Sequence, residues 1–156
     1  MSLYRFLSLL VSVLGAFIAA ITLFSLFFAL ANPAALFQVF LFGCTVLYTW
    51  FANKFRKTVI DQQRGMTRRQ KDWLQVNAIV AFIFAVLGIT NSIYIFTTPA
   101  ILDDLIKALP VVPPGMDLKK LLYNFSIGLF IGCSILLAHI IWTYILVRKH
   151  HDYFEA

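Results

Sequence analysis

Charged residues are missing from most of this chain. Four long apolar stretches contain no Asp, Glu, Lys or Arg: Phe6–Leu30, Ala34–Ala52, Leu74–Thr98 and Leu121–Val147. Each is long enough to cross a hydrocarbon core of ~30 Å as an α-helix, at a rise of ~1.5 Å per residue. The segments between them are too short for a separate soluble domain. The sequence therefore predicts one all-α membrane domain with four spans over residues 1–156.

Residues that bind metals or carry out catalysis are also scarce. The chain has two cysteines and three histidines, without the CxxC or Cys/His spacing of a metal or redox site. Cys44 and Cys133 lie in apolar stretches, where free cysteine packs as a small hydrophobe. His150 and His151 lack a third ligand for zinc. With no nucleophile–base pair and no acidic residue inside a span, we expect no cofactor, no metal, no catalytic residue and no enzyme activity.

The positive charge is uneven, which predicts the orientation. The net charge is +6, and we attribute it to membrane topology rather than to nucleic-acid binding. In a four-span arrangement ten of the thirteen basic residues fall on the side of both termini. Cytoplasmic segments carry such an excess, so both termini are expected in the cytoplasm, most simply at a bacterial inner membrane. The ten are Arg5, Lys54, Arg56, Lys57, Arg64, Arg68, Arg69, Lys71, Arg148 and Lys149.

The connection on that side, residues 53–73, reads as a helical hairpin. The second span is expected to continue as a helix to Arg64 and to end at Gly65, because glycine enters the left-handed conformation without penalty. Thr67 with Gln70 predicts a capping box that opens the third span. The basic residues here have two interpretations: topology and solubility, or a docking site for an anionic lipid or an acidic partner.

The connection between spans three and four predicts a short external helix over residues 99–109. Thr98-Pro99 begins it, and its apolar face suits the membrane interface or the end of the bundle. The segment Pro110–Gly115 is expected to end it, and Asp117 to cap the fourth span.

Small and polar residues mark the faces where the spans should pack. In the third span these include Ala81, Ala85 and Gly88, and in the fourth Gly128, Gly132 and His139. The spacing near 3.5 residues predicts an antiparallel, left-handed bundle. Gly128 and Gly132 form a GxxxG step, which leaves a homodimer face as an alternative to packing inside the bundle.

A few polar residues inside the spans are the candidate site. Gln38, Asn91 and Asn124 form an outer group, expected to hydrogen-bond one another across the bundle rather than to line a pathway. His139 lies nearer the other end, about 12 Å from Val147, and an ionisable group inside a span is a functional hypothesis by default. We expect a neutral imidazole bonded to Tyr48 or Thr49.

The sequence favours a non-enzymatic membrane protein, an accessory or assembly subunit that acts through helix–helix contacts. Its expected partners are the lipid bilayer and another membrane protein or a second copy, and no nucleic acid. The main alternative is a small channel or carrier that uses the outer polar group. A lipid-modifying enzyme would have only Asp103, Asp104 and His150 to draw on, and they lie on opposite sides.

Overall fold

Four long helices make up most of the protein. The computed structural model describes residues 2–29, 32–107 and 117–155. The long helices are α1 (Ser2–Ala29), α2 (Pro33–Phe55), α3 (Arg68–Thr97) and α5 (Leu118–Lys149). Each is long and apolar enough to cross a membrane, as in a multi-pass membrane protein. They contain the four predicted spans except for two end residues. Thr98, the predicted end of the third span, is the C-cap of α3, and Leu30, the predicted end of the first, lies outside the described residues.

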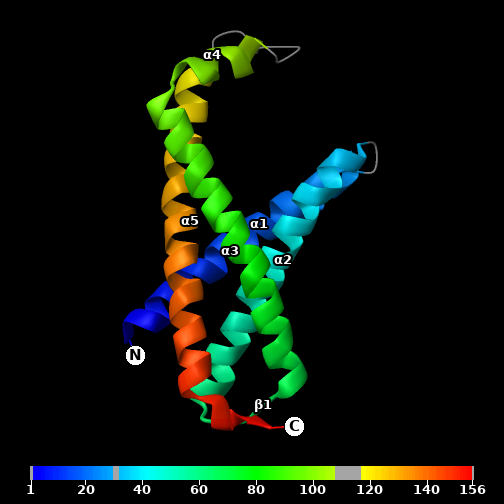
Figure 1. Ribbon diagram of the computed structural model, residues 1–156, viewed down its shortest axis with the longest axis vertical. Helices are drawn as coiled ribbons and strands as arrows, with labels where there is room; N and C mark the ends of the chain where they lie inside the picture. The colour runs from blue at the N-terminus through cyan, green and yellow to red at the C-terminus, as the bar shows by residue number, and fades with distance from the viewer. Residues whose placement is uncertain (1, 30–31, 108–116, 156) are drawn as a thin grey trace.

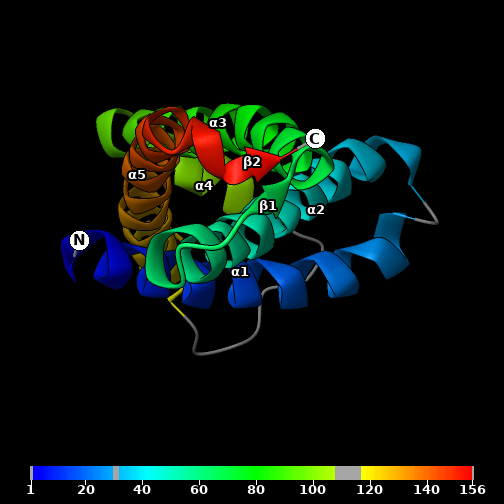
Figure 2. The ribbon, with the colours of Figure 1, turned by 90° about the horizontal axis from the view of Figure 1, so that it is seen from below.

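The long helices form two hairpins that separate toward one end. The helix α1 packs mainly on α2, α2 also packs on α3, and α3 packs on α5, whereas α1 and α5 share a smaller contact. Figure 1 shows α1 and α2 leaning away from α3 and α5 in the direction of the short helix α4 (Ala100–Lys107). Figure 2, seen from below, shows α2 between α1 and α3. We call the end that carries α4 the α4 end, and the end that carries the C-terminus the terminal end.

The predicted external helix is present and begins one residue later than predicted. It occupies Ala100–Lys107, while residues 108–109 and the segment Pro110–Gly115 lie outside the described residues. Leu102 is buried beneath it, as its amphipathic pattern predicts. Asp117 caps α5 by accepting a hydrogen bond from the backbone N–H of Lys120 (3.0 Å), and Lys119 Nζ lies 2.8 Å from Asp103 Oδ1, which ties α4 to α5.

The basic connection departs from the prediction at its turn. The helix α2 runs into a π-helix, η1 (Arg56–Asp61), so the helical segment ends three residues before Arg64. Gln63 follows it in the left-handed region with φ 52°, two residues before the predicted stop at Gly65. The Arg64 N–H donates to the Thr58 carbonyl (2.9 Å), and this wider turn closes the segment before Gly65 is reached. Thr67 is the N-cap of α3 as predicted, but its side chain makes no capping hydrogen bond.

The C-terminal residues pack on this connection. After a 3-10 turn, η2 (His151–Tyr153), strand β2 (Phe154–Glu155) pairs in parallel with β1 (Met66–Thr67). The Phe154 ring stacks on Phe55, with centroids 6.0 Å apart, and Lys71 Nζ lies 4.9 Å from the Phe154 centroid. The chain end therefore joins α2 and α3 at the terminal end (Figure 2).

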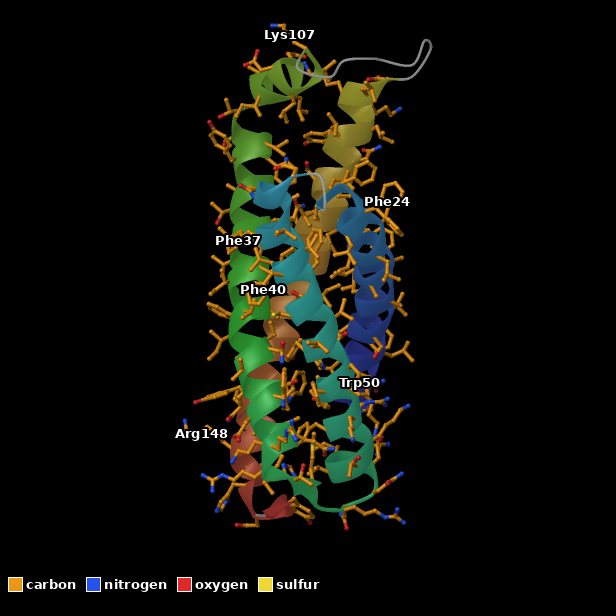
Figure 3. The ribbon with its side chains drawn as sticks, turned by 90° about the vertical axis from the view of Figure 1, so that its right-hand side faces the viewer. Phe24, Phe37, Phe40, Trp50, Lys107 and Arg148 are labelled. Carbon is orange, nitrogen blue, oxygen red and sulfur yellow. The ribbon has the colours of Figure 1, made fainter. Side chains whose placement is uncertain are left out.

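The outward surface of the long helices is apolar. Large hydrophobic side chains are exposed along all four, among them Phe24, Phe37, Phe40 and Trp50, which Figure 3 labels. Charged residues gather at the two ends, for example Lys107 at the α4 end and Arg148 at the terminal end (Figure 3). An apolar belt between polar ends is what a membrane-spanning protein presents to lipid.

Candidate functional site

A cavity of about 590 Å³ lies between the two hairpins, in the part of the protein nearer the α4 end. Residues of all four long helices line it, and most of them are apolar. We call this cavity the cleft. Its lining residues include Leu14, Ile18, Gln38, Phe42, Thr49, Phe84, Asn91, Phe125, Gly128 and Gly132.

The outer polar group is only partly brought together by the cleft. Gln38 on α2 and Asn91 on α3 both line the cleft, whereas Asn124 does not. All three side chains are exposed, and no hydrogen bond joins any two of them within the described ranges. The prediction that they bond one another across the bundle was therefore wrong. Gln38 and Asn91 belong to hairpins that separate at this level, and Asn124 does not line the cleft. Two amides instead face an apolar cavity.

The glycines of α5 lie on the wall of the cleft. Gly128 is exposed, and a Cβ added there would meet no described atom within 4 Å, while one added at Gly132 would lie 3.4 Å from Leu14 Cδ2. Gly128 thus does not pack inside the bundle as predicted. Of the three residues predicted for the packed face of α5, only His139 is buried. The rest of the buried stripe is formed by neighbouring positions, among them Ser126, Cys133, Leu136 and Ile140.

The small residues of α3 do lie against other helices. Ala81, Ala85 and Gly88 are buried. A Cβ at Gly88 would collide with Cys133 Sγ, so glycine here allows α3 and α5 to approach closely. Among helices in lipid, such close backbone contact replaces the hydrophobic driving force that acts in water.

His139 lies at the centre of a buried polar network on the terminal side of the cleft. The Tyr48 hydroxyl lies 2.8 Å from His139 Nδ1 and donates to Thr143 Oγ1 (3.3 Å). Tyr4 on α1 stacks on the imidazole, with centroids 5.3 Å apart, and its hydroxyl lies 3.1 Å from Thr143 Oγ1. The bond to Tyr48 was one of the two predicted, whereas Thr49 bonds the Val46 carbonyl instead.

Tyr4 is the network residue that the sequence analysis missed. It precedes the predicted first span, which starts at Phe6, yet it is fully buried. Its spacing from Ser8 and Val11, both also buried, repeats the same helical face and was the available signal. The network thus connects three helices, α1, α2 and α5, through side chains that are all 2 % exposed or less.

Two polar atoms buried with this network lack a partner. His139 Nε2 and Ser8 Oγ make no hydrogen bond in the described part of the chain. An orphaned buried donor or acceptor costs ~1–3 kcal/mol, so the network is held by its other contacts. Among the residues that the structure describes, no three His, Cys, Asp or Glu side chains are placed to share a metal ion.

Ion pairs hold the start of α1 at the terminal end. Arg5 Nη2 lies 2.8 Å from Asp61 Oδ1, and Arg56 Nη1 lies 3.8 Å from Asp61 Oδ2. Arg56 also donates to Asn53 Oδ1 (2.8 Å). The Asp61 carboxylate therefore pairs with two basic residues. The pair with Arg5 attaches the start of α1 to η1, at the end of α2.

Comparisons of the chain with protein families, with curated proteins and with solved structures gave no match. The functional argument accordingly depends on the cleft and on the buried network.

Proposed function

We propose that this is a non-enzymatic accessory or assembly subunit that binds a transmembrane helix of a partner membrane protein in the cleft. The observation that carries the proposal is the cleft itself: about 590 Å³ between two hairpins of long apolar helices, with two amides and three glycines on its walls. Small residues let a helix backbone approach closely, and such contacts drive helix association in lipid.

The two amides support a helix as the occupant. Gln38 and Asn91 are exposed toward the cleft, and neither side chain makes a hydrogen bond within the described residues. Asn91 lies six residues before Thr97, about 9 Å along the helix from its end, which places it within the apolar belt. An amide without a hydrogen bond is unfavourable in hydrocarbon, and a partner helix with a polar side chain at this depth would satisfy it.

The proposal includes an orientation. The four helices would form an antiparallel bundle, left-handed where α2, α3 and α5 pack together, in a bacterial inner membrane. The terminal end, with its excess of basic residues, would face the cytoplasm.

A small carrier or channel is the second candidate, because Gln38 and Asn91 line the same cavity. The apolar character of the other lining residues makes a polar solute a poor occupant. A second copy of this chain is the remaining alternative for the helix, through Gly128 and Gly132.

The test asks whether the protein loses its partner when a large side chain fills the cleft. The tagged protein is purified from native membranes in mild detergent, as wild type, as Gly128→Phe and as Val76→Phe. Val76 is exposed on α3 and lines neither the cleft nor any other cavity described here. We expect a stoichiometric partner with wild type and Val76→Phe and its loss with Gly128→Phe, at unchanged melting temperature. Loss of the partner in both variants contradicts the proposal, as does a wild-type preparation without any partner protein. Light scattering shows whether the partner is a second copy of this chain.

A further inference from the structure

A second cavity lies on a different face of the protein. This groove, of about 450 Å³, runs between α3 and α5 in the terminal half and shares no lining residue with the cleft. Ala78, Ile79 and Phe82 line it on the α3 side, and Ile140, Ile141 and Tyr144 on the α5 side. From Leu74 to Phe82 it follows α3 for about 12 Å.

The hydroxyl groups on the floor of the groove are already hydrogen-bonded. Tyr48 and Thr143 reach it from the buried network. The Tyr48 hydroxyl already contacts His139 Nδ1 and Thr143 Oγ1, and Thr143 Oγ1 also contacts the Tyr4 hydroxyl. With these hydroxyls paired, the groove suits a hydrocarbon chain rather than a polar solute.

Two basic side chains mark the terminal end of the groove. Arg148 Cζ lies 5.8 Å from the ring centroid of Tyr144, which lines the groove. Lys71 lies one helical turn before Gln75 and three residues before Leu74, the lining residue of α3 nearest that end. In the described ranges neither Lys71 nor Arg148 forms an ion pair with a carboxylate. Lys71 Nζ lies against the Phe154 ring, as Arg148 lies against Tyr144, but no described carboxylate neutralises either charge. Both cations can therefore attract an external anion at the level where the helices leave the apolar belt.

We propose that the groove holds one acyl chain of an anionic phospholipid, whose phosphate is bound at the end marked by Lys71 and Arg148. The apolar walls accommodate the chain, and the cations bind the phosphate through charge-assisted hydrogen bonds. This site is more specific than a general attraction of anionic lipid to the basic connection, since it includes α5 and a cavity for the tail. It is also independent of what occupies the cleft.

The headgroup preference follows from the charges. Two unpaired cations favour phosphatidylglycerol, with a net negative charge, over zwitterionic phosphatidylcholine. At the surface each Lys or Arg contributes roughly fivefold in binding to anionic lipid, so two contribute about 10–30-fold.

The test is native mass spectrometry of the purified full-length protein, titrated with phosphatidylglycerol or phosphatidylcholine. We expect wild type to retain one phosphatidylglycerol at a concentration about 10–30-fold lower than that needed for phosphatidylcholine. The double variant Lys71→Gln/Arg148→Gln should lose this preference. The control Lys54→Gln/Lys57→Gln removes the same charge from α2 and η1, outside the groove, and should keep it.

A second pair of variants tests the acyl chain. Ala78→Trp fills the groove and should reduce retention of both lipids, whereas Val76→Trp, on the exposed side of α3, should not. Equal retention of the two lipids by wild type would overturn the proposal. The same loss of preference from both double variants would overturn it as well, since that indicates nonspecific charge. Melting curves confirm that each variant is folded before it is scored.

Discussion

Tyr48 and His139 lie 91 residues apart in the sequence, yet the Tyr48 hydroxyl oxygen lies 2.8 Å from His139 Nδ1. This contact joins α2 to α5 inside the apolar belt, and the Tyr4 ring on the other side of the imidazole adds α1. The network holds the two hairpins together at the terminal end, where they do not separate. It lies on the terminal side of the cleft.

The hydroxyl of Tyr48 should contribute measurably to stability. In Tyr48→Phe, His139 Nδ1 loses its hydrogen bond, so both ring nitrogens are left buried without a partner among the described residues. We expect the protein to be destabilised by about 1–2 kcal/mol, measured by thermal unfolding in detergent. Tyr94→Phe is the control, because Tyr94 is exposed on α3. Equal melting temperatures of the two variants would show that the network does not hold the hairpins.

The glycines should differ sharply in their tolerance of a methyl group. A Cβ at Gly15 would lie 2.8 Å from Thr49 Cβ, whose side chain is fixed by its bond to the Val46 carbonyl. Gly15→Ala should therefore cost about 1–3 kcal/mol through overpacking between α1 and α2.

The matched variant is Gly128→Ala, where the new methyl group meets no described atom within 4 Å. It should be neutral or slightly stabilising, since alanine favours the helix over glycine by ~0.5–1 kcal/mol. Both are measured by chemical or thermal unfolding. A destabilised Gly128→Ala variant would mean that α5 faces its neighbours differently from the structure.

The orientation is tested by cysteine labelling in a Cys44→Ala/Cys133→Ala background. Gln62 follows η1 at the terminal end and Asp104 lies on α4, and both are exposed. With a membrane-impermeant maleimide on intact cells, we expect Asp104→Cys to be labelled and Gln62→Cys only after permeabilisation. Met66 would be a poor reporter of the same side, because pairing with Phe154 buries it. Labelling of Gln62→Cys alone on intact cells reverses the proposed orientation.

The sequence was sufficient for the helices and for part of their packing. Apolar length and missing charge located the four long helices, because hydropathy reports directly on what lipid tolerates. The spacing of Ala81, Ala85 and Gly88 identified the buried face of α3. The pairing of His139 with Tyr48 could be anticipated because a buried imidazole needs a hydrogen-bond partner from a neighbouring helix.

The features that were missed depend on geometry between segments. Hydropathy does not show whether the backbone hydrogen bonds of a helix join residues four or five apart. The π-helix η1 and the left-handed Gln63 were therefore not predicted. The GxxxG step at Gly128 suits a face inside the bundle and one that lines a cleft equally well. Which of these it forms depends on the angle between the hairpins, which no local pattern encodes.

The central claim is that the cleft receives a helix of another membrane protein, and photocrosslinking in native membranes tests it most directly. Phe125 lines the cleft and Phe24 is exposed on α1 outside it, so benzoylphenylalanine can replace either ring with little change in size. From position 125 we predict a discrete crosslinked protein that disappears when Gly128→Phe is added, and from position 24 only lipid adducts. Crosslinks to lipid alone from position 125, or the same protein from both positions, would contradict the account.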